Sequence, residues 1–357
     1  MKVGLVMIVK DEEAVIQRAL ESAKPFISTY IIVDTGSTDR TKEIIASVMS
    51  DMPGAIIDRP WVSFGHNRSE ALALCDGQMD WAIMLDADDS LAGAVPPASV
   101  WQTPVNAFMM RCIHGAIRHQ RTQIFRTGVG WVYKGAVHEY PVCRSKATVV
   151  ALPPETYVIT RCEGSRSRDP EKYLKDARLL EADLLKKPED HRLLFYLAQS
   201  YRDAGLLDEA RRCYQRRADL GGWDQERYMT LVNLILLAED DDDDRKRLTW
   251  LAINLCPTRL DAQYMYLKIR RVAGLEPTQE TYAIATFCKE RKAGALDLFV
   301  NPHIYDWGMD DELAIAAFKT GHFREAYEAS MRCVMMAPEA MREAAVKNAR
   351  AAYQHIQ

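Results

Sequence analysis

The sequence lacks both an excess of one charge and a cysteine pairing pattern. Its 357 residues carry 46 Lys and Arg against 50 Asp and Glu, a net charge of −4. The net charge therefore gives no sign of binding to nucleic acid or to an anionic membrane, although it does not exclude a local basic groove. The eight cysteines include no C-x-x-C pair. We interpret them as reduced thiols of a cytoplasmic protein, not as a disulfide framework or a zinc site.

Long hydrophobic runs are also missing. The apolar run at residues 3–9 is too short for a signal-peptide core with its cleavage site and too short to cross a bilayer. No other segment qualifies as a transmembrane span, so we expect a soluble protein, with peripheral membrane contact left open. The length allows two or three domains.

What the first part does contain is an alternation of strands and helices. The all-apolar run "VGLVMIV" is typical of a parallel strand covered on both faces. We predict strands at 3–9, 29–37, 54–58 and 81–85, and helices at 11–23, 38–49 and 67–75. This order predicts a doubly wound sheet, whose ligands gather at the carboxyl ends of its strands.

The pattern changes twice further along. Residues 104–162 are strand-like with no clear helix, which predicts an appended or mixed sheet. From residue 172 onward the chain is helical, and residues 196–221 align with 313–338. In that alignment Gly205 matches Gly321 and Ala210 matches Ala326, as in the tetratricopeptide (TPR) helical hairpin. We expect domains at 1–165 and 166–357. The acidic run 239–245 predicts a solvated loop that could favour the start of the next helix.

One stretch, "DWAIMLDADDSL" (80–91), directs an apolar strand at three carboxylates, Asp86, Asp88 and Asp89. A surface turn is one explanation. The other is a hard cation, because ionised carboxylates need partners when buried and such cations prefer oxygen ligands. The pattern alone does not decide between the two.

The order of motifs adds to this. The segments "MIVKDEEAVIQRALESA", "IIVDTGSTDRTKEII", "FGHNRSEALA" and "DWAIMLDADD" follow one another in residues 1–95. This ordered set resembles the family-2 glycosyltransferases of the GT-A fold. The segment "WVYKGAVHEY" (131–140) and the helical second half resemble a subgroup with C-terminal TPR-like repeats. The resemblance implies a Rossmann-like, doubly wound α/β GT-A domain followed by an all-α helical-repeat domain.

The resemblance also implies roles for the donor-binding residues. Asp34 would read the nucleotide base or ribose, although a capping role in "DTGSTD" is the alternative. Asp86 and Asp88 would hold the donor diphosphate and a cation, Mn²⁺ or Mg²⁺, with Asp89 in support. Asp11 would touch the nucleotide, and Arg68 would lie near the diphosphate unless it faces solvent.

His138 and Glu139 are the next pair implied. Glu139 would be the general base on the acceptor hydroxyl, and His138 would ligate the metal or contact the diphosphate. Adjacent side chains on a strand point to opposite faces, so both can face the site only if the chain bends there. Where relatives often carry a metal-ligating His, near Arg161 or Cys162, this chain has "ITRCEGS". Arg166 and Arg168 lie on a polar loop that could be a lid over phosphates or a plain linker.

The resemblance thus implies a metal-dependent, inverting glycosyltransferase that uses a nucleotide sugar, with UDP-sugar favoured. The acceptor, held partly by the helical repeats, could be a glycan, a protein, a lipid-linked sugar or a modified DNA base. Net charge does not favour DNA, which needs a basic track. Such a track is suggested by Arg211, Arg212, Arg216 and Arg217, but arginines on the solvent face of a helix are the commoner explanation. The alternative is a non-catalytic TPR-type interaction protein with a degenerate glycosyltransferase domain. A nucleotidyltransferase would have a Gly-rich basic loop after the first strand, and "VMIVKDEE" lacks one.

Overall fold

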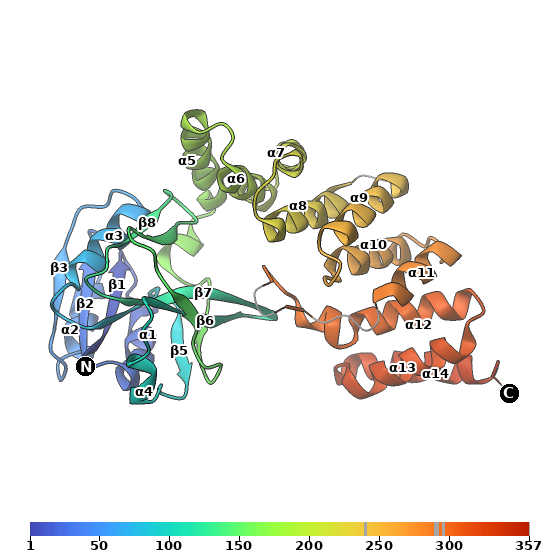
Figure 1. Cartoon of the computed structure of the whole chain (residues 1–357), viewed down its shortest axis with the longest axis horizontal. Coiled ribbons are helices and arrows are strands. Elements are labelled where there is room, and N and C mark those ends of the chain that lie inside the picture. The colour runs from blue at the N-terminus through green and yellow to red at the C-terminus, as the bar shows by residue number, and fades with distance from the viewer. Residues whose placement is uncertain (239–240, 289–292, 295–296, 357) are drawn as a thin grey trace. The chain divides into compact units, whose positions relative to one another are not determined.

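The computed structural model describes residues 1–238, 241–288, 293–294 and 297–356, and its chain forms two compact units (Figure 1). The first unit is Met1–Lys186 and the second is Lys187–Gln357. The division thus falls beyond the boundary expected at 165/166. Helix α5 (Lys172–Lys186) stays with the first unit, where its buried Asp176 pairs with Arg166.

The first unit is built on a nine-stranded sheet in the order β3-β2-β1-β4-β7-β6-β11-β5, with β10 beside β6. Strands β3, β2, β1 and β4 run parallel, and β7 and β5 run antiparallel to their neighbours. This confirms the doubly wound, mixed sheet. The bounds are β1 Val3–Val9, β2 Thr29–Asp34, β3 Gly54–Asp58, β4 Trp81–Met84, β5 Ser90–Gly93, β6 Ala107–His114, β7 Ile117–Arg126, β10 Val149–Ala151 and β11 Thr156–Ile159.

Both faces of the sheet are covered, which explains the continuous apolar run of β1. Leu5 lies in a core cluster with residues of α1 (Ile16–Ala23) and α2 (Thr41–Val48). Its neighbour Val6 lies in the opposite cluster with Leu72 of α3 (Phe64–Leu74). Successive side chains of a strand point to opposite faces, so a strand between two layers has no polar side.

One expectation in this unit needs correction, and the structure makes another more exact. The helix expected from residue 11 begins at Ile16, because residues 12–15 form a turn in which Glu12 O accepts bonds from Val15 N and Ile16 N. The strand-like segment 131–140 is a hairpin of β8 (Trp131–Lys134) and β9 (Tyr140–Cys143), which form a separate two-stranded sheet. The short helix α4 (Ala98–Trp101) and strands β5 and β10 had no clear sequence signal.

The second unit is a succession of helices in which each packs on the next. Two of its helical pairs, α6–α7 and α12–α13, are the hairpins expected from the internal repeat. Gly205 and Gly321 both have positive φ, +80° and +85°, at the turns, and Ala210 and Ala326 are buried between the paired helices. The bounds are α6 His191–Asp203, α7 Leu207–Asp219, α8 Asp224–Leu237, α9 Asp242–Leu255, α10 Asp261–Val272, α11 Gln279–Cys288, α12 Met309–Lys319, α13 Phe323–Met336 and α14 Glu339–Tyr353.

Of the acidic run 239–245, residues 239 and 240 lie outside the described residues. Asp241 caps α9 by accepting a bond from Asp244 N, in agreement with an acidic helix start. Among the described residues, no helix has both the length and the apolar character needed to cross a membrane.

Candidate active site

The carboxyl ends of β1, β2 and β4 bring the first set of expected residues to one edge of the sheet. Val9 of β1 pairs with Asp34 of β2, and Val6 pairs with Met84 of β4. Because the three strands are parallel neighbours, the segments that follow them begin at the same edge. Asp34 closes β2, and the Asp86–Asp89 turn follows β4 directly.

Asp34 caps the turn that follows it with only one of its two carboxylate oxygens. Its Oδ1 accepts bonds from Gly36 N at 2.9 Å and Ser37 N at 2.8 Å. Its Oδ2 is buried and has no hydrogen-bond partner among the described residues. A buried carboxylate oxygen without a donor is costly. Asp34 is therefore both a cap of its turn and an acceptor available to a ligand.

The structure gives Asp11 a place between two turns. Its backbone lies in the left-handed region, with φ +54°. Its Oδ1 accepts bonds from Thr38 N and Thr38 Oγ1, and its N–H donates to Ser37 Oγ. Asp11 thus ties the turn after β1 to the turn after β2, and contact with a nucleotide stays a prediction.

Arg68 of α3 points inward and joins two carboxylates. Its Nη2 bonds Asp86 Oδ1, and its Nε lies 2.6 Å from Glu139 Oε1. The side chain is only 12% exposed, which excludes the solvent-facing alternative. Burial acts to lower the pKa of Arg68, but the charges of Asp86 and Glu139 outweigh it and raise the pKa above its ordinary value. Arg68 therefore stays cationic.

Asp86 lies between two guanidinium groups. Besides Arg68, Arg121 of β7 has its Nη1 3.7 Å from Asp86 Oδ2. Burial acts to raise the pKa of Asp86, but the charges of Arg68 and Arg121 hold it below its ordinary value. Asp86 is therefore ionised at neutral pH. Sequence reasoning missed Arg121, because nothing in the β7 segment marks which of its polar residues turns toward β4.

Asp89, three residues after Asp86, is a buried carboxylate that also contacts Arg121. It is nearly inaccessible and accepts bonds from Arg121 Nη2 at 3.0 Å and Arg161 N at 3.2 Å. Burial, together with the neighbouring Asp86 charge, raises the pKa of Asp89 to about 7. Its contacts link β4, β7 and the segment after β11.

Asp88 is bound by a segment from far along the chain. Its Oδ2 accepts bonds from Glu163 N and Gly164 N, each at 3.0 Å. Arg18 of α1 pairs with Glu163 and also donates to Asp88 O. The segment 163–165 therefore crosses the strand ends beside Asp88. Sequence reasoning identified neither Arg18 nor these amides, which lie 75 and 76 residues from Asp88.

The same segment reaches the turn after β1. Ser165 N donates to Glu12 Oε2 at 3.0 Å, and Ser165 Oγ donates to Lys10 O. Burial raises the pKa of Glu12, and the bonds from Ser165 oppose this effect. Arg166, which follows, pairs with Asp176 and lies over the Phe64 ring with its Cζ 4.6 Å from the ring centroid.

The β8–β9 turn provides the bend that His138 and Glu139 require. Gly135 has φ +103° and His138 has φ +51°. Glu139 turns inward to Arg68, whereas the His138 side chain is exposed. The turn packs closely on α3, since a Cβ at Gly65 would collide with Gly135 O. Glu139 therefore joins the site, and His138 lies at its outside.

Three-ligand metal clusters are absent from the part of the chain that the structure describes. No group of three His, Cys, Asp or Glu side chains there could hold an ion. The position near which relatives carry a His has Arg161, whose Nη1 bonds Ser90 Oγ, and Cys162, whose Sγ lies 3.7 Å from His114 Nε2. The structure does not bring His138 into such a group with Asp86 and Asp88.

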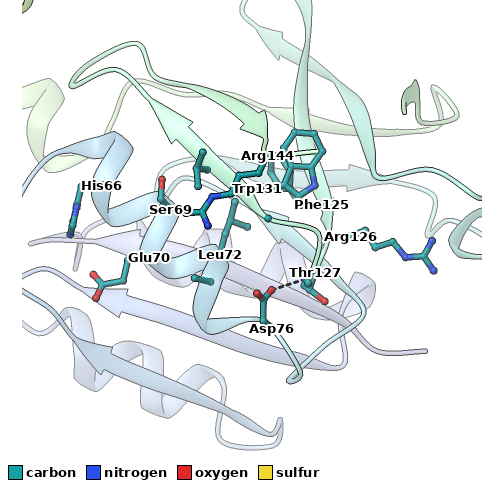
Figure 2. Close-up of a pocket in the computed structure, with 14 residues that line it drawn as sticks. His66, Ser69, Glu70, Leu72, Asp76, Phe125, Arg126, Thr127, Trp131 and Arg144 are labelled. Atoms are coloured by element: carbon teal, nitrogen blue, oxygen red, sulfur yellow. Dashed lines mark hydrogen bonds between the residues drawn. The ribbon is translucent and has the colours of Figure 1, made fainter. Parts of the chain in front are cut away.

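A separate cavity of about 320 Å³ lies along α3 (Figure 2). Ser69, Glu70 and Leu72 of α3 line it together with Trp131 of β8 and the chain after β7. It contains none of the strand-end carboxylates. It is therefore distinct from the site built around Asp86.

The family model of glycosyl transferase family 2 matches residues 5–95. Residues 5–95 form a glycosyl transferase family 2 domain. This domain contains Asp34, Arg68, Asp86 and Asp88. Glu139 and Arg121 lie beyond the matched residues.

Curated relatives match the same part of the chain. A TPR repeat-containing protein of Synechococcus elongatus is 35% identical over 91 residues, which cover 25% of this chain and 21% of that protein. An uncharacterized glycosyltransferase of Rickettsia felis is 33% identical over 91 residues, covering 26% of this chain and 30% of the relative. The chain thus spans less than a third of the length of these relatives.

Solved structures show weaker likenesses. S. aureus TarS 1–349 in complex with UDP-GlcNAc is 14% identical, with a TM-score of 0.35 over 77% of this chain and 93% of that chain. MamA is 17% identical, with a TM-score of 0.30 over 52% of this chain and 89% of that chain.

Proposed function

We propose that the first unit is the catalytic domain of a glycosyltransferase that moves a sugar from a nucleotide sugar to an acceptor hydroxyl. The observation that carries the proposal is the convergence of Asp34, Asp86, Asp88 and Arg68 within a family 2 domain. Asp34 offers an unpartnered oxygen to a nucleoside. Arg68 offers its charge to a diphosphate. UDP-sugar is the favoured donor, by resemblance to the family.

The proposal includes a divalent cation, Mn²⁺ or Mg²⁺. The donor set fits a hard cation, because both aspartates offer carboxylate oxygens and Asp88 uses only Oδ2 in its bonds to described residues. Asp86 and Asp88 would hold the ion together with oxygens of the donor diphosphate. When bound, the ion would supply Lewis-acid stabilisation of charge on the leaving group. His138 as a third ligand remains a prediction.

Glu139 is the proposed base. It takes the proton from the acceptor hydroxyl while the oxygen attacks the anomeric carbon. The electron pair of the breaking C–O bond leaves with the diphosphate, and the configuration inverts, as the family resemblance implies. A carboxylate paired with a guanidinium is a weak base. The proposal therefore requires that Arg68 pairs with the diphosphate when the donor binds, so that its ion pair with Glu139 weakens and Glu139 becomes a stronger base.

The acceptor is proposed to be held partly by the helical unit, as a glycan, a protein, a lipid-linked sugar or a modified DNA base. The contacts of the arginine cluster disfavour DNA, because its members already bond carbonyls or carboxylates of the same unit. These are Arg211 with Leu237 O, Arg212 with Glu209, Arg216 with Pro188 O and Arg217 with Glu226. A cytoplasmic location is part of the proposal, supported by free thiols at the seven described cysteines.

The proposal is tested by calorimetric titration of UDP with and without Mn²⁺, followed by donor hydrolysis with a panel of nucleotide sugars. Asp88→Ala should keep the fold and lose metal-dependent turnover. Asp58→Ala is the matched control, because Asp58 ends β3 at the same edge of the sheet and is exposed. Near-normal transfer by the Asp88 variant would refute the metal assignment. Absence of metal-dependent UDP binding in the unmodified protein would favour the non-catalytic interaction protein.

A further inference from the structure

An exposed aromatic side chain lies on the loop that joins β3 to α3. Trp61 lies between β3 and α3 and is 43% exposed. Its ring meets Phe64 edge to face, with 4.7 Å between centroids. Exposing part of a large aromatic surface to water is unfavourable. A loop that fixes such a residue outward therefore suggests a ligand for it.

Asn67 holds this loop in place. Its side chain is fully buried, and all of its hydrogen bonds go to the loop. Asn67 Oδ1 accepts bonds from Val62 N at 2.9 Å and Ser63 N at 3.3 Å, while Nδ2 donates to Pro60 O at 3.0 Å. The bonds surround Trp61 on both sides along the chain. The backbone on either side of Trp61 is therefore held in place by Asn67.

The loop is also joined to the strand end that carries Asp34. Arg59 N donates to Asp34 O at 2.9 Å, two residues before Trp61. Asp34 is the residue with the buried, unpartnered Oδ2. A flat ring with N–H donors on its edge would satisfy both features. Its face would stack on Trp61, and its edge would donate to Asp34.

Groups of α3 and β4 could bind the part of such a ligand that lies away from the flat ring. Phe64 and Arg68 are four residues apart on α3, so they share a helix face. Arg68 reaches Asp86, at the end of β4. Strands β2 and β4 are both neighbours of β1, so their ends lie roughly 10 Å apart. A ribose and a phosphate can bridge such a span between a base at Asp34 and a terminal phosphate at Asp86.

We propose that Trp61 is the stacking platform for the nucleobase of the donor, with Asn67 as the residue that positions it. This inference rests on the proposed function, because it assigns the base end of the same donor. Stacking on an aromatic side chain tolerates any base. Trp61 therefore contributes affinity for the nucleoside, and Asp34 contributes the choice among bases.

The test compares UDP with inorganic pyrophosphate, both titrated with Mn²⁺. Trp61→Ala should weaken UDP binding roughly tenfold, the scale expected for one stacked base, and leave pyrophosphate binding unchanged. Trp61→Phe should retain most of the affinity, because it keeps an aromatic face. Trp223→Ala is the control, since Trp223 is similarly exposed but lies in the second unit. UDP should also quench tryptophan fluorescence less in Trp61→Phe than in the unmodified protein.

Equal UDP affinity in Trp61→Ala and the unmodified protein would overturn the inference and leave the proposed function standing. A variant that binds UDP normally but loses only transfer to the acceptor would also overturn it, because the platform would then face the acceptor. Failure of the unmodified protein to bind UDP or any other nucleoside diphosphate would refute both proposals. That failure is seen without any variant, so the two cases are distinguishable.

Discussion

Removal of the Arg68 guanidinium should destabilise the first unit, because this group compensates two carboxylates at once. In Arg68→Met, Asp86 loses its partner at Oδ1, and Glu139 loses the guanidinium 2.6 Å from Oε1. The methionine keeps most of the apolar stem in place, so the change is mainly one of charge.

The magnitude follows from the burial of the two carboxylates. Removing one partner of a buried ion pair costs about 3–5 kcal/mol. Asp86 is 31% exposed and keeps Arg121 at 3.7 Å, so part of its charge remains compensated, whereas Glu139 is only 12% exposed. We therefore expect the free energy of unfolding of this unit to fall by about 2–4 kcal/mol, below the full cost of an uncompensated pair.

Scanning calorimetry of the whole chain in metal-free buffer measures this loss. For a unit of this size 1 kcal/mol shifts Tm by roughly 2–4 °C, so the transition of the first unit should move down on the order of 5–15 °C. Arg59→Met is the matched control. Its partner Glu70 is 2.7 Å away, but both side chains are about a third exposed, and such a pair contributes below about 1 kcal/mol.

The pH dependence provides a second check. The folded-state pKa of Asp86 is lowered, so this group stabilises the fold above its ordinary pKa, and the stabilisation is lost as the pH falls through the lowered value. Since Arg68 is a cause of that shift, the difference between Arg68→Met and the unmodified protein should be large at pH 7 and smaller at acid pH. The double variant Arg68→Met/Glu139→Gln should recover part of the loss. Equal Tm values for the Arg68 and Arg59 variants at pH 7 would refute the reasoning.

Two further predictions concern other buried groups. Arg259→Met should lower the free energy of unfolding of the second unit by about 3–5 kcal/mol in urea denaturation, because it leaves the buried Asp261 carboxylate without the guanidinium at 2.9 Å. Arg247→Met, in a pair with 61% exposure of the arginine, should change it little. In the first unit, burial and the Arg121 charge lower the pKa of His119 to about 4. Stability from neutral His119 is then present above about pH 6.5 and lost as the pH falls toward 4, so Tm of His119→Gln should fall less than that of the unmodified protein between pH 7 and pH 4.5. An unchanged acid profile would contradict this.

Local pattern was sufficient for strands β1 to β4 and for the carboxylates that follow β2 and β4, but not for β5 and β10. An all-apolar run such as residues 3–9 has one stable environment, the centre of a sheet covered on both faces, and β1 lies there. The alternating order of strands and helices predicted that Asp34 and Asp86 lie at the carboxyl edge of the sheet, and the pairing of β2 and β4 with β1 brings them to the same part of that edge. The repeated Gly and Ala positions likewise predicted the hairpins α6–α7 and α12–α13.

The sequence by itself thus determined the parallel strands β1 to β4, the two repeated helical hairpins and the residues at the strand ends, because these depend on periodicity over a few residues. Only the tertiary structure decided which distant groups surround those residues. Arg121, Glu163 and Gly164 reach the Asp86–Asp88 turn from segments far along the chain. Their positions depend on the β6–β7 hairpin and on the path after β11, which no short-range pattern encodes. Burial, and with it the pKa of Asp89, is likewise a property of the packed site and not of the Asp-x-Asp-Asp sequence.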